Sequence, residues 1–197
     1  MKKIVIATKN PGKLKEIKTA FENLPVEILS LADFENIPDA IEDGETFEEN
    51  ARIKAKYFCE QTGLACIADD SGLEVEALNN LPGVYSARFA GYHADDGTNN
   101  KKLLAELEKI SVTESPADYR CALCFYDTDN TEIITDGIIR GTIKNISKGT
   151  GGFGYDPYFY IEDNKTMAEL TPVEKDLISH RGEALRKMLA KLKERLP

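Results

Sequence analysis

Apolar residues along this chain recur with two different spacings, which predict a protein built from both strands and helices. The run over 1–7 is short and mainly apolar, as in a buried first strand. Pro11 stands near the start of a predicted helix over 11–24, where its missing N–H group costs nothing. The apolar residues of that helix recur at helical spacing and form one face, made by Leu14, Ile17, Phe21 and Leu24.

A capping box opens the second predicted helix. Thr46 is placed to cap the helix, and Glu49 follows three residues later. The helix then continues to about Gln61, and Gly63 is the glycine that ends it.

Further elements follow from the same two spacings. A wholly apolar run over 64–68 predicts a buried strand that ends at Ala68, before the polar residues 69–72. Two more helices are predicted over 99–110 and 181–196. The other predicted strands cover 26–31, 74–78, 117–127, 132–143 and 157–161. Strands and helices alternate early, and strands then pair directly, so we predict an α/β protein with a mixed β-sheet flanked by helices.

Composition narrows the classes of protein. The 197 residues include 25 Lys and Arg against 34 Asp and Glu, a formal net charge of −9. This acidity argues against coating of a nucleic-acid backbone, but a small phosphorylated ligand needs only a few local cations. No segment approaches the roughly 18 consecutive apolar residues of a membrane span, and the first apolar run stops at Thr8, too soon for a signal peptide. We therefore expect a cytoplasmic protein that binds neither nucleic acid nor membranes.

The four cysteines are expected to stay reduced in that compartment. Cys121 and Cys124 form a C-x-x-C pair, a spacing that metal and redox sites use. The surrounding residues predict a strand, however, and residues three apart in a strand point to opposite faces. No second C-x-x-C pair is present to complete a zinc site, so we expect no functional thiol pair.

The first candidate site lies where the first strand meets the first helix. A helix N-terminus offers free N–H groups and the positive end of a dipole, so anions bind there. The segment adds polar groups, a glycine for close approach and positive charge, through Thr8, Lys9, Asn10, Pro11, Gly12 and Lys13. It is not a Walker A loop, because G-x-x-x-x-G-K-[ST] is absent. An ordinary turn with solvated lysines stays open as the alternative.

The second candidate is the pair Asp69 and Asp70 at the end of a buried strand. Two carboxylates there are costly unless they bind a metal or hydrogen-bond donors, and strand ends are where α/β proteins place ligands. Mg²⁺ prefers one or two carboxylates together with phosphate oxygens and water, and the acidic stretch around Glu42 offers a further ligand. The alternative is an Asx-type turn closed by Ser71 and Gly72.

Two later segments carry aromatic or polar groups. Residues 149–157 contain a literal G-x-G-x-x-G, but a predicted strand follows instead of a helix, so we reject dinucleotide binding. This loop could still hold a flat ring with Phe153 and Tyr155, or be a flexible hairpin connection. Residues 179–181 (Ser-His-Arg) could read oxygen acceptors on a base or bind phosphate, or simply cap the last helix with surface charges.

Together, six segments resemble a known family, the non-canonical purine nucleoside triphosphate pyrophosphatases, also called inosine or xanthosine triphosphate pyrophosphatases. Any one segment is weak, but all six in order are highly specific, and the resemblance runs nearly end to end. The segments are residues 8–13 (TKNPGK), 42–51 (EDGETFEENA), 68–73 (ADDSGL), 82–88 (PGVYSAR), 151–157 (GGFGYDP) and 179–182 (SHRG).

The resemblance implies a reaction, a fold and an assembly. The reaction is hydrolysis of dITP, ITP or XTP to the nucleoside monophosphate and pyrophosphate with Mg²⁺, which cleanses the nucleotide pool. The fold is an elongated mixed β-sheet flanked by helices, with two lobes and an active-site cleft between them. It would be a single catalytic domain over 1–197, without a separate regulatory domain. The assembly is a homodimer, and the ligand is a small-molecule purine nucleoside triphosphate.

The resemblance also implies how the metal and the attacking water are handled. Asp70 would be the general base and a Mg²⁺ ligand. Glu42 would be the second ligand, and Asp69 would support the metal site. A carboxylate near Mg²⁺ can orient and deprotonate the attacking water.

The substrate-binding residues follow from the same resemblance. The triphosphate would be held by residues 8–13, with Ser71 and Lys175 helping. Phe153 would stack on the base, and the rest of the base pocket would be Gly154, Tyr155, Asp156, His180 and Arg181. Inosine and xanthosine carry an oxygen at the purine 6-position where adenosine carries an amino group, so donors such as those of His180 and Arg181 would favour them.

Two rival functions stay open. A nucleotide-binding or sensing module without turnover would keep both pockets, although paired aspartates repel phosphate unless a metal intervenes. A general phosphatase would release orthophosphate instead of pyrophosphate. The product formed from dITP distinguishes these two functions from a pyrophosphatase: pyrophosphate indicates a pyrophosphatase, orthophosphate a phosphatase, and no product a binding module.

Overall fold

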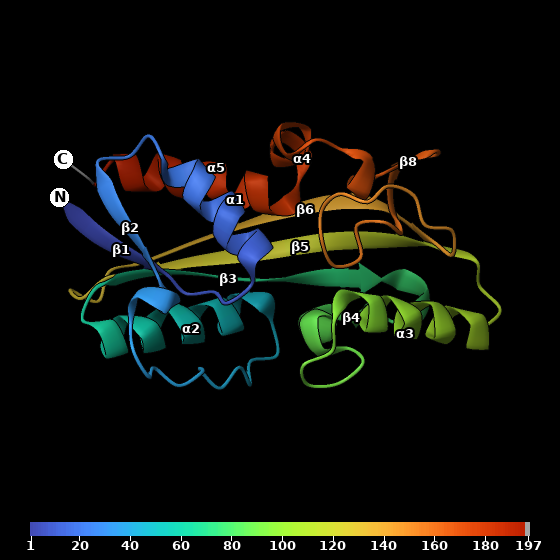
Figure 1. Ribbon diagram of the computed structural model, residues 1–197, viewed down its shortest axis with the longest axis horizontal. Helices are drawn as coiled ribbons and strands as arrows, with labels where there is room; N and C mark the ends of the chain where they lie inside the picture. The colour runs from blue at the N-terminus through green and yellow to red at the C-terminus, as the bar shows by residue number, and fades with distance from the viewer. Residues whose placement is uncertain (196–197) are drawn as a thin grey trace. The chain divides into compact units, whose positions relative to one another are not determined.

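The computed structural model describes residues 1–195, and its strands and helices form the α/β fold with a mixed sheet that the apolar pattern predicts (Figure 1). The helices are α1 (Pro11–Phe21), α2 (Phe47–Thr62), α3 (Asp96–Lys109), α4 (Pro172–Ile178) and α5 (His180–Lys193). The strands are β1 (Lys2–Ile6), β2 (Val26–Ser30), β3 (Ala65–Val75), β4 (Leu81–Pro82), β5 (Glu114–Tyr126), β6 (Glu132–Lys144), β7 (Phe159–Glu162) and β8 (Lys165–Thr166). Short 3₁₀ helices are η1 (Leu31–Asp33), η2 (Glu76–Leu78), η3 (Gly83–Arg88) and η4 (Met167–Glu169).

Within the described residues the strands form one sheet in the order β2-β1-β3-β5-β6-β7-β8, with β4 paired to β3. β1 runs parallel to both β2 and β3, and Ile4 lies opposite Ala65 in the second of these pairs. The pairs β3–β4, β6–β7 and β7–β8 are antiparallel. Both kinds of pairing therefore occur, and the direct pairing predicted for 117–127 with 132–143 is confirmed by the neighbours β5 and β6.

The chain divides into two compact units. Unit 1 holds Met1–Asp70, Cys121–Gly137 and the described residues from Arg181 on. Unit 2 holds Ser71–Arg120 and Ile138–His180. Each unit has its own cluster of buried apolar side chains.

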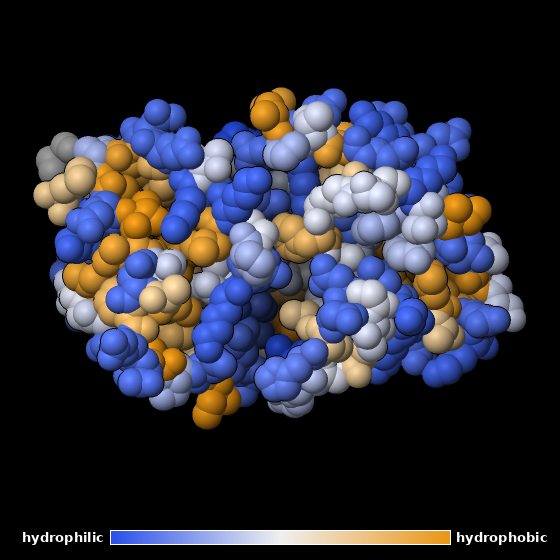
Figure 2. Space-filling model, viewed as in Figure 1, coloured by the Kyte–Doolittle hydropathy of each residue, from blue (hydrophilic) through white to orange (hydrophobic). Residues whose placement is uncertain are grey.

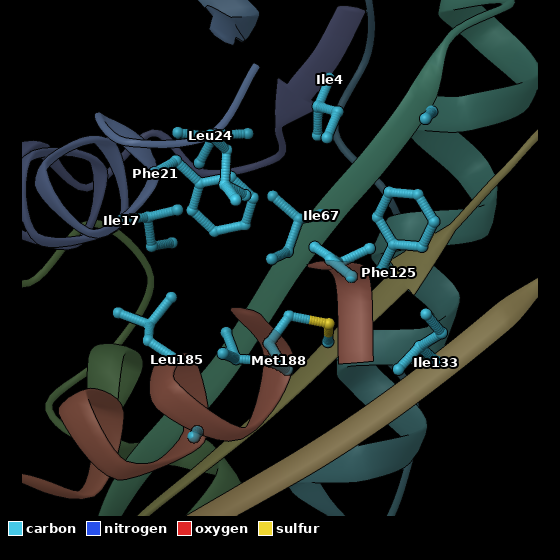
Figure 3. Close-up of a cluster of buried hydrophobic side chains, with 14 of the residues drawn as sticks. Ile4, Ile17, Phe21, Leu24, Ile67, Phe125, Ile133, Leu185 and Met188 are labelled. Atoms are coloured by element: carbon cyan, nitrogen blue, oxygen red, sulfur yellow. The ribbon is translucent and has the colours of Figure 1, made fainter. Parts of the chain in front are cut away.

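In unit 1, α1 and α5 cover one face of the strands and α2 covers the other (Figure 1). The apolar cluster fills the face towards α1 and α5, where Ile67 and Phe125 of the strands meet Phe21 and Met188 of the helices (Figure 3). Each of these four side chains is at most 2% exposed. The helical spacing read from the sequence over 11–24 thus marks the buried face of α1.

In unit 2, α3 packs against strand residues through its own apolar stripe. Leu103 and Leu107 of α3 lie in the same buried cluster as Leu73 of β3 and Tyr119 of β5. Asn99 joins α3 to η3, because its Nδ2 donates to the carbonyl oxygen of Ala87.

β3 differs from its prediction. It does not end at Ala68 but continues to Val75, so the Asx-type turn that stayed open as the alternative for 69–72 is wrong. The predicted strand over 74–78 is also wrong in part, because its last three residues form η2. The physical reason is that Asp69 and Asp70 both have cationic partners, which let the two carboxylates continue a buried strand.

Smaller differences concern helix ends. α1 stops at Phe21 instead of 24, and α3 begins at Asp96 instead of 99. α4 was not predicted, although Thr171 and Glu174 form a capping box at its start. The predicted end of the last helix, at 196, lies outside the described residues.

The four cysteines are buried free thiols. Burial raises the pKa of each, and it raises the pKa of Cys121 and of Cys124 to about 12. These thiols therefore stay protonated near neutral pH.

The visible surface is largely hydrophilic, with separate hydrophobic patches (Figure 2). One of these patches lies over α4, which exposes Val173, Leu177 and Ile178. None of the described helices is both long enough and apolar enough to span a membrane.

Candidate functional site

The segment between β1 and α1 forms a capped helix start in unit 1. Asn10 is the N-cap of α1, and its Oδ1 accepts from the Lys13 N–H at 3.0 Å. The N–H of Asn10 itself donates to Thr8 Oγ1 at 3.2 Å. Pro11 begins the helix, and none of the residues in its first turn is acidic. The segment therefore presents the positive end of α1 without a carboxylate of its own, an arrangement that favours an anion.

The two lysines of this segment differ in their surroundings. Lys9 is exposed and pairs with Asp39 at the surface, 2.5 Å away. The Lys13 side chain is only 15% exposed, and its Nζ lies 3.1 Å from Asp69 Oδ2. Lys13 is therefore a largely buried cation held by an ion pair, whereas Lys9 is a cation of the surface.

Asp69 lies between two cations. Its Oδ2 is 3.1 Å from Lys13 Nζ and 3.1 Å from Arg181 Nε, and all three side chains are largely buried. Arg181 also reaches Glu16 of α1 through Nη1, at 2.5 Å. Burial by itself raises the pKa of Asp69, but Lys13, Arg181 and Lys54 outweigh it and hold that pKa below its usual range. Asp69 is therefore a fixed negative charge that links α1 to α5.

Asp70 points to the opposite face of β3, because side chains alternate along a strand. Its partners accordingly come from α2. Lys54 Nζ lies 3.0 Å from Asp70 Oδ1, and Asn50 Nδ2 donates to Asp70 Oδ2 at 3.3 Å. Burial raises the pKa of Asp70, although Lys54 opposes this effect. The pKa values of the neighbouring residues Asp69 and Asp70 are thus shifted in opposite directions.

The carboxylates of Glu42 and Asp70 converge on a single cation. Lys54 Nζ lies 2.8 Å from Glu42 Oε2 as well as 3.0 Å from Asp70 Oδ1. Mg²⁺ is usually bound by one or two protein carboxylates, and two carboxylates that contact the same cation form such a set of ligands. The residues present therefore fit a divalent ion with two protein ligands.

A third carboxylate does not join this pair. The described residues contain no group of three His, Cys, Asp or Glu side chains that could hold a metal ion. Asp69, predicted beside the metal, points away from Asp70 towards Lys13 and Arg181.

In unit 2 the glycine-rich loop is organised around the carboxylate of Asp156. Its Oδ2 accepts from the Phe153 N–H at 3.0 Å and from Lys175 Nζ at 2.7 Å. The Tyr119 hydroxyl also hydrogen-bonds to this carboxylate. A Cβ on Gly152 would lie 2.0 Å from Asp156 Oδ2, which explains glycine at that position. Asp156 therefore acts inside the loop and fixes its shape.

Two aromatic contacts lie beside this loop. Lys175 Nζ is 4.3 Å from the centroid of the Phe153 ring. The His180 ring stacks on Tyr119, with 4.8 Å between centroids and 9° between planes. The Tyr155 hydroxyl donates to the carbonyl oxygen of Ser86 at 2.7 Å, which ties the loop to η3.

The structure thus gathers the predicted site residues into two groups. Unit 1 holds Thr8, Lys9, Asn10, Pro11, Gly12, Lys13, Glu42, Asp69, Asp70 and Arg181. Unit 2 holds Ser71, Phe153, Gly154, Tyr155, Asp156, Lys175 and His180. Two of these residues have partners that the sequence did not predict. Arg181 pairs with Asp69, and Lys175 pairs with Asp156.

Sequence reasoning missed Asn50, Lys54 and Tyr119. A signal for the first two was available, because Asn50 and Lys54 fall among the buried positions of α2, next to Ala51 and Ala55. A lysine in the apolar stripe of a helix is costly to bury unless it is paired. Tyr119 gives no such signal, since its partners His180 and Asp156 are distant in sequence.

Comparison with known proteins gives matches over nearly the whole chain. The sequence model of the Ham1 family matches residues 4–191. A protein of Bacillus anthracis named dITP/XTP pyrophosphatase is 49% identical over 197 residues, which cover 98% of each chain. One of the same name from Geobacter sulfurreducens is 48% identical over 186 residues and 94% of each chain. Among solved structures, a HAM1 protein from Coxiella burnetii superposes with a TM-score of 0.89 at 40% identity, over 98% of this chain and 100% of its own.

Proposed function

This chain belongs to the Ham1 family, and from that membership we propose that it is a nucleoside triphosphate pyrophosphohydrolase. Its substrates are non-canonical purine nucleotides such as dITP, ITP and XTP, which it converts to the monophosphate and pyrophosphate. The observation that carries the proposal is the pair of carboxylates, Glu42 and Asp70, that meet at one cation in a chain so similar to dITP/XTP pyrophosphatases.

The triphosphate is bound by residues 8–13 at the start of α1. The N-terminus of α1 and the Lys13 ammonium supply positive charge there, and Asp69 keeps that ammonium in place at 3.1 Å. Ser71 and Lys175 complete the set of substrate-binding groups. The Lys175 ammonium also donates a hydrogen bond to Asp156, so it helps to fix the shape of the glycine-rich loop.

Asp70 is the general base, and it accepts a proton from the water that attacks the triphosphate. Lys54 and Asn50 hold its two oxygens at 3.0 and 3.3 Å, which orients the carboxylate before substrate binds. Glu42 and Asp70 hold Mg²⁺, with Asp69 supporting the site from the other face of β3. Bound there, Mg²⁺ supplies positive charge that offsets the charge of the triphosphate.

The magnesium requirement can be tested through Glu42. Chelation with EDTA should abolish pyrophosphate release from dITP, and Mg²⁺ in excess of the chelator should restore it. Glu42→Gln should raise the Mg²⁺ concentration needed for half-maximal rate, because it removes one of two charged ligands. Glu45→Gln is the matched control, since Glu45 lies in the same stretch but is exposed. Full activity in EDTA, or equal Mg²⁺ curves for the two variants, would contradict the assignment.

The glycine-rich loop of unit 2 takes part in purine recognition. Phe153 stacks on the base, and Gly154, Tyr155, Asp156, His180 and Arg181 complete the pocket. Tyr119 holds the His180 ring by stacking, and Asp156 holds the Phe153 backbone. A pocket whose donors meet the 6-oxygen of inosine or xanthosine leaves the amino group of adenosine mispaired. The proposed function therefore predicts faster hydrolysis of dITP and XTP than of dATP, and equal rates for all three would argue against it.

Phe153→Ala should raise KM for dITP about tenfold, because stacking of a base on an aromatic ring contributes roughly 1–3 kcal/mol. The preference for dITP over dATP should fall with it. Phe89→Ala is a matched control, since Phe89 also lies in unit 2 under a lysine, with Lys102 Nζ 4.7 Å from its centroid. Steady-state kinetics with both nucleotides measure the effect. Unchanged selectivity in Phe153→Ala would remove the stacking role.

Three further properties are part of the proposal. Residues 1–197 act as one catalytic domain, the protein is a homodimer, and it works in the cytoplasm, where its nucleotide substrates are found. Sedimentation equilibrium at micromolar concentration measures the assembly, and a mass of one chain would contradict the dimer.

A further inference from the structure

Gly154 is held at both of its backbone groups by side chains of α3. Its N–H donates to Asp96 Oδ2 at 2.6 Å, and its carbonyl oxygen accepts from Asn100 Nδ2 at 2.9 Å. Asp96 and Asn100 are four residues apart, so they lie on the same face of the helix. Neither residue falls in the six segments that resemble the pyrophosphatase family.

The residue that they hold determines the direction of the loop. Gly154 has φ of +64°, in the left-handed region, so the chain turns there between Phe153 and Tyr155. An added Cβ would meet only the Tyr119 hydroxyl, at 4.0 Å. Glycine is therefore needed for its backbone conformation and not for lack of space. Any rotation of the Gly154 peptide groups would move the Phe153 ring.

The two contacts are strong for different reasons. Asp96 is exposed, but its short bond to the Gly154 N–H involves a carboxylate, and such charge-assisted bonds are stronger than neutral ones. Asn100 is only 8% exposed, so its amide is desolvated. Its Oδ1 has no hydrogen-bond partner among the described residues, so the bond to Gly154 orients the amide.

We propose that Asp96 and Asn100 are positioning residues for purine selection, which fix both backbone groups of Gly154 and thereby set the place of the Phe153 ring. The proposal rests on the proposed function, because it assumes that Phe153 meets the purine. It adds α3 to the elements that determine which purine is accepted.

The test compares Asp96→Ala with Asp95→Ala. Asp95 is the N-cap of α3 and accepts from the Thr98 N–H at 2.6 Å, so both variants lose an exposed carboxylate at the same helix end. Only Asp96 contacts the loop. Asp96→Ala should raise KM for dITP about tenfold, as expected for loss of a charge-assisted hydrogen bond, with a smaller change in kcat. Its preference for dITP over dATP should fall, whereas Asp95→Ala should keep the wild-type values.

A conservative variant separates positioning from a general effect of charge. Asp96→Asn retains an oxygen that accepts from the Gly154 N–H, so it should recover most of the selectivity. Equal selectivity in Asp96→Ala and Asp95→Ala would overturn the inference, as would loss of selectivity in Asp96→Asn equal to that in Asp96→Ala. If the wild-type protein itself does not distinguish dITP from dATP, the proposed function fails, and the inference fails with it.

Discussion

Replacing Asp70 by asparagine should abolish pyrophosphate release from dITP while leaving the fold intact. Asparagine has the shape of aspartate but cannot take a proton from water, and it is a poorer metal ligand. General-base catalysis contributes about 10²–10⁴-fold to rate, so kcat should fall by at least that factor. The measurement is turnover of dITP, with thermal unfolding and circular dichroism to establish that the protein is folded.

Asp127→Asn provides the control for Asp70→Asn. Asp127 is also a buried aspartate of unit 1 paired with a lysine, Lys2, and within the described part of the chain its carboxylate accepts hydrogen bonds only from Lys2 and Thr128. This variant should keep near-wild-type turnover. Near-wild-type turnover in Asp70→Asn, by contrast, would defeat the assignment of Asp70 as the base.

Replacing Arg181 by alanine should cause a large loss of stability. The Arg181 side chain is 1% exposed and forms two ion pairs, from Nε to Asp69 Oδ2 at 3.1 Å and from Nη1 to Glu16 Oε2 at 2.5 Å. Removing it takes this partner from the fully buried Asp69 and from the partly exposed Glu16. Breaking a buried ion pair in this way costs about 3–5 kcal/mol, which for a chain of this length lowers Tm by about 6–20 °C.

Arg52→Ala is the matched variant for Arg181→Ala. Arg52 also bridges two carboxylates, Glu48 at 2.9 Å and Glu132 at 3.0 Å, but its side chain is 39% exposed. Exposed ion pairs contribute about 0–1 kcal/mol, so its Tm should change by a few degrees at most. Thermal unfolding of both variants measures the difference. Equal shifts would mean that Arg181 is not the internal link between α1 and α5 that its geometry indicates.

Local signals in the sequence predicted the elements that depend on neighbouring residues. The capping box of Thr46 and Glu49 and the left-handed Gly63 at the other end are both present in α2. The length of β3 was not predictable in the same way. Its continuation through Asp69 and Asp70 depends on Lys13, Arg181 and Lys54, which belong to the three helices α1, α5 and α2.

The candidate site shows the same difference between features that depend on neighbouring residues and features that depend on residues distant in sequence. The sequence motifs identified the carboxylates and the glycine-rich loop, because each is a short segment. The partners that decide what each carboxylate does are far away in sequence, as with Lys175 for Asp156 or Arg181 for Asp69. If β3 had been predicted to continue through residues 69 and 70, the alternation of side chains along a strand would have placed Asp69 and Asp70 on opposite faces of the sheet.

The identity of the product tests the central claim most directly. Wild-type protein with dITP and Mg²⁺ should release one pyrophosphate for each dIMP formed, with no orthophosphate, when both anions are quantified in the same reaction. Release of orthophosphate together with dIDP, or binding of dITP without any product, would contradict the proposal that this chain is a nucleoside triphosphate pyrophosphohydrolase.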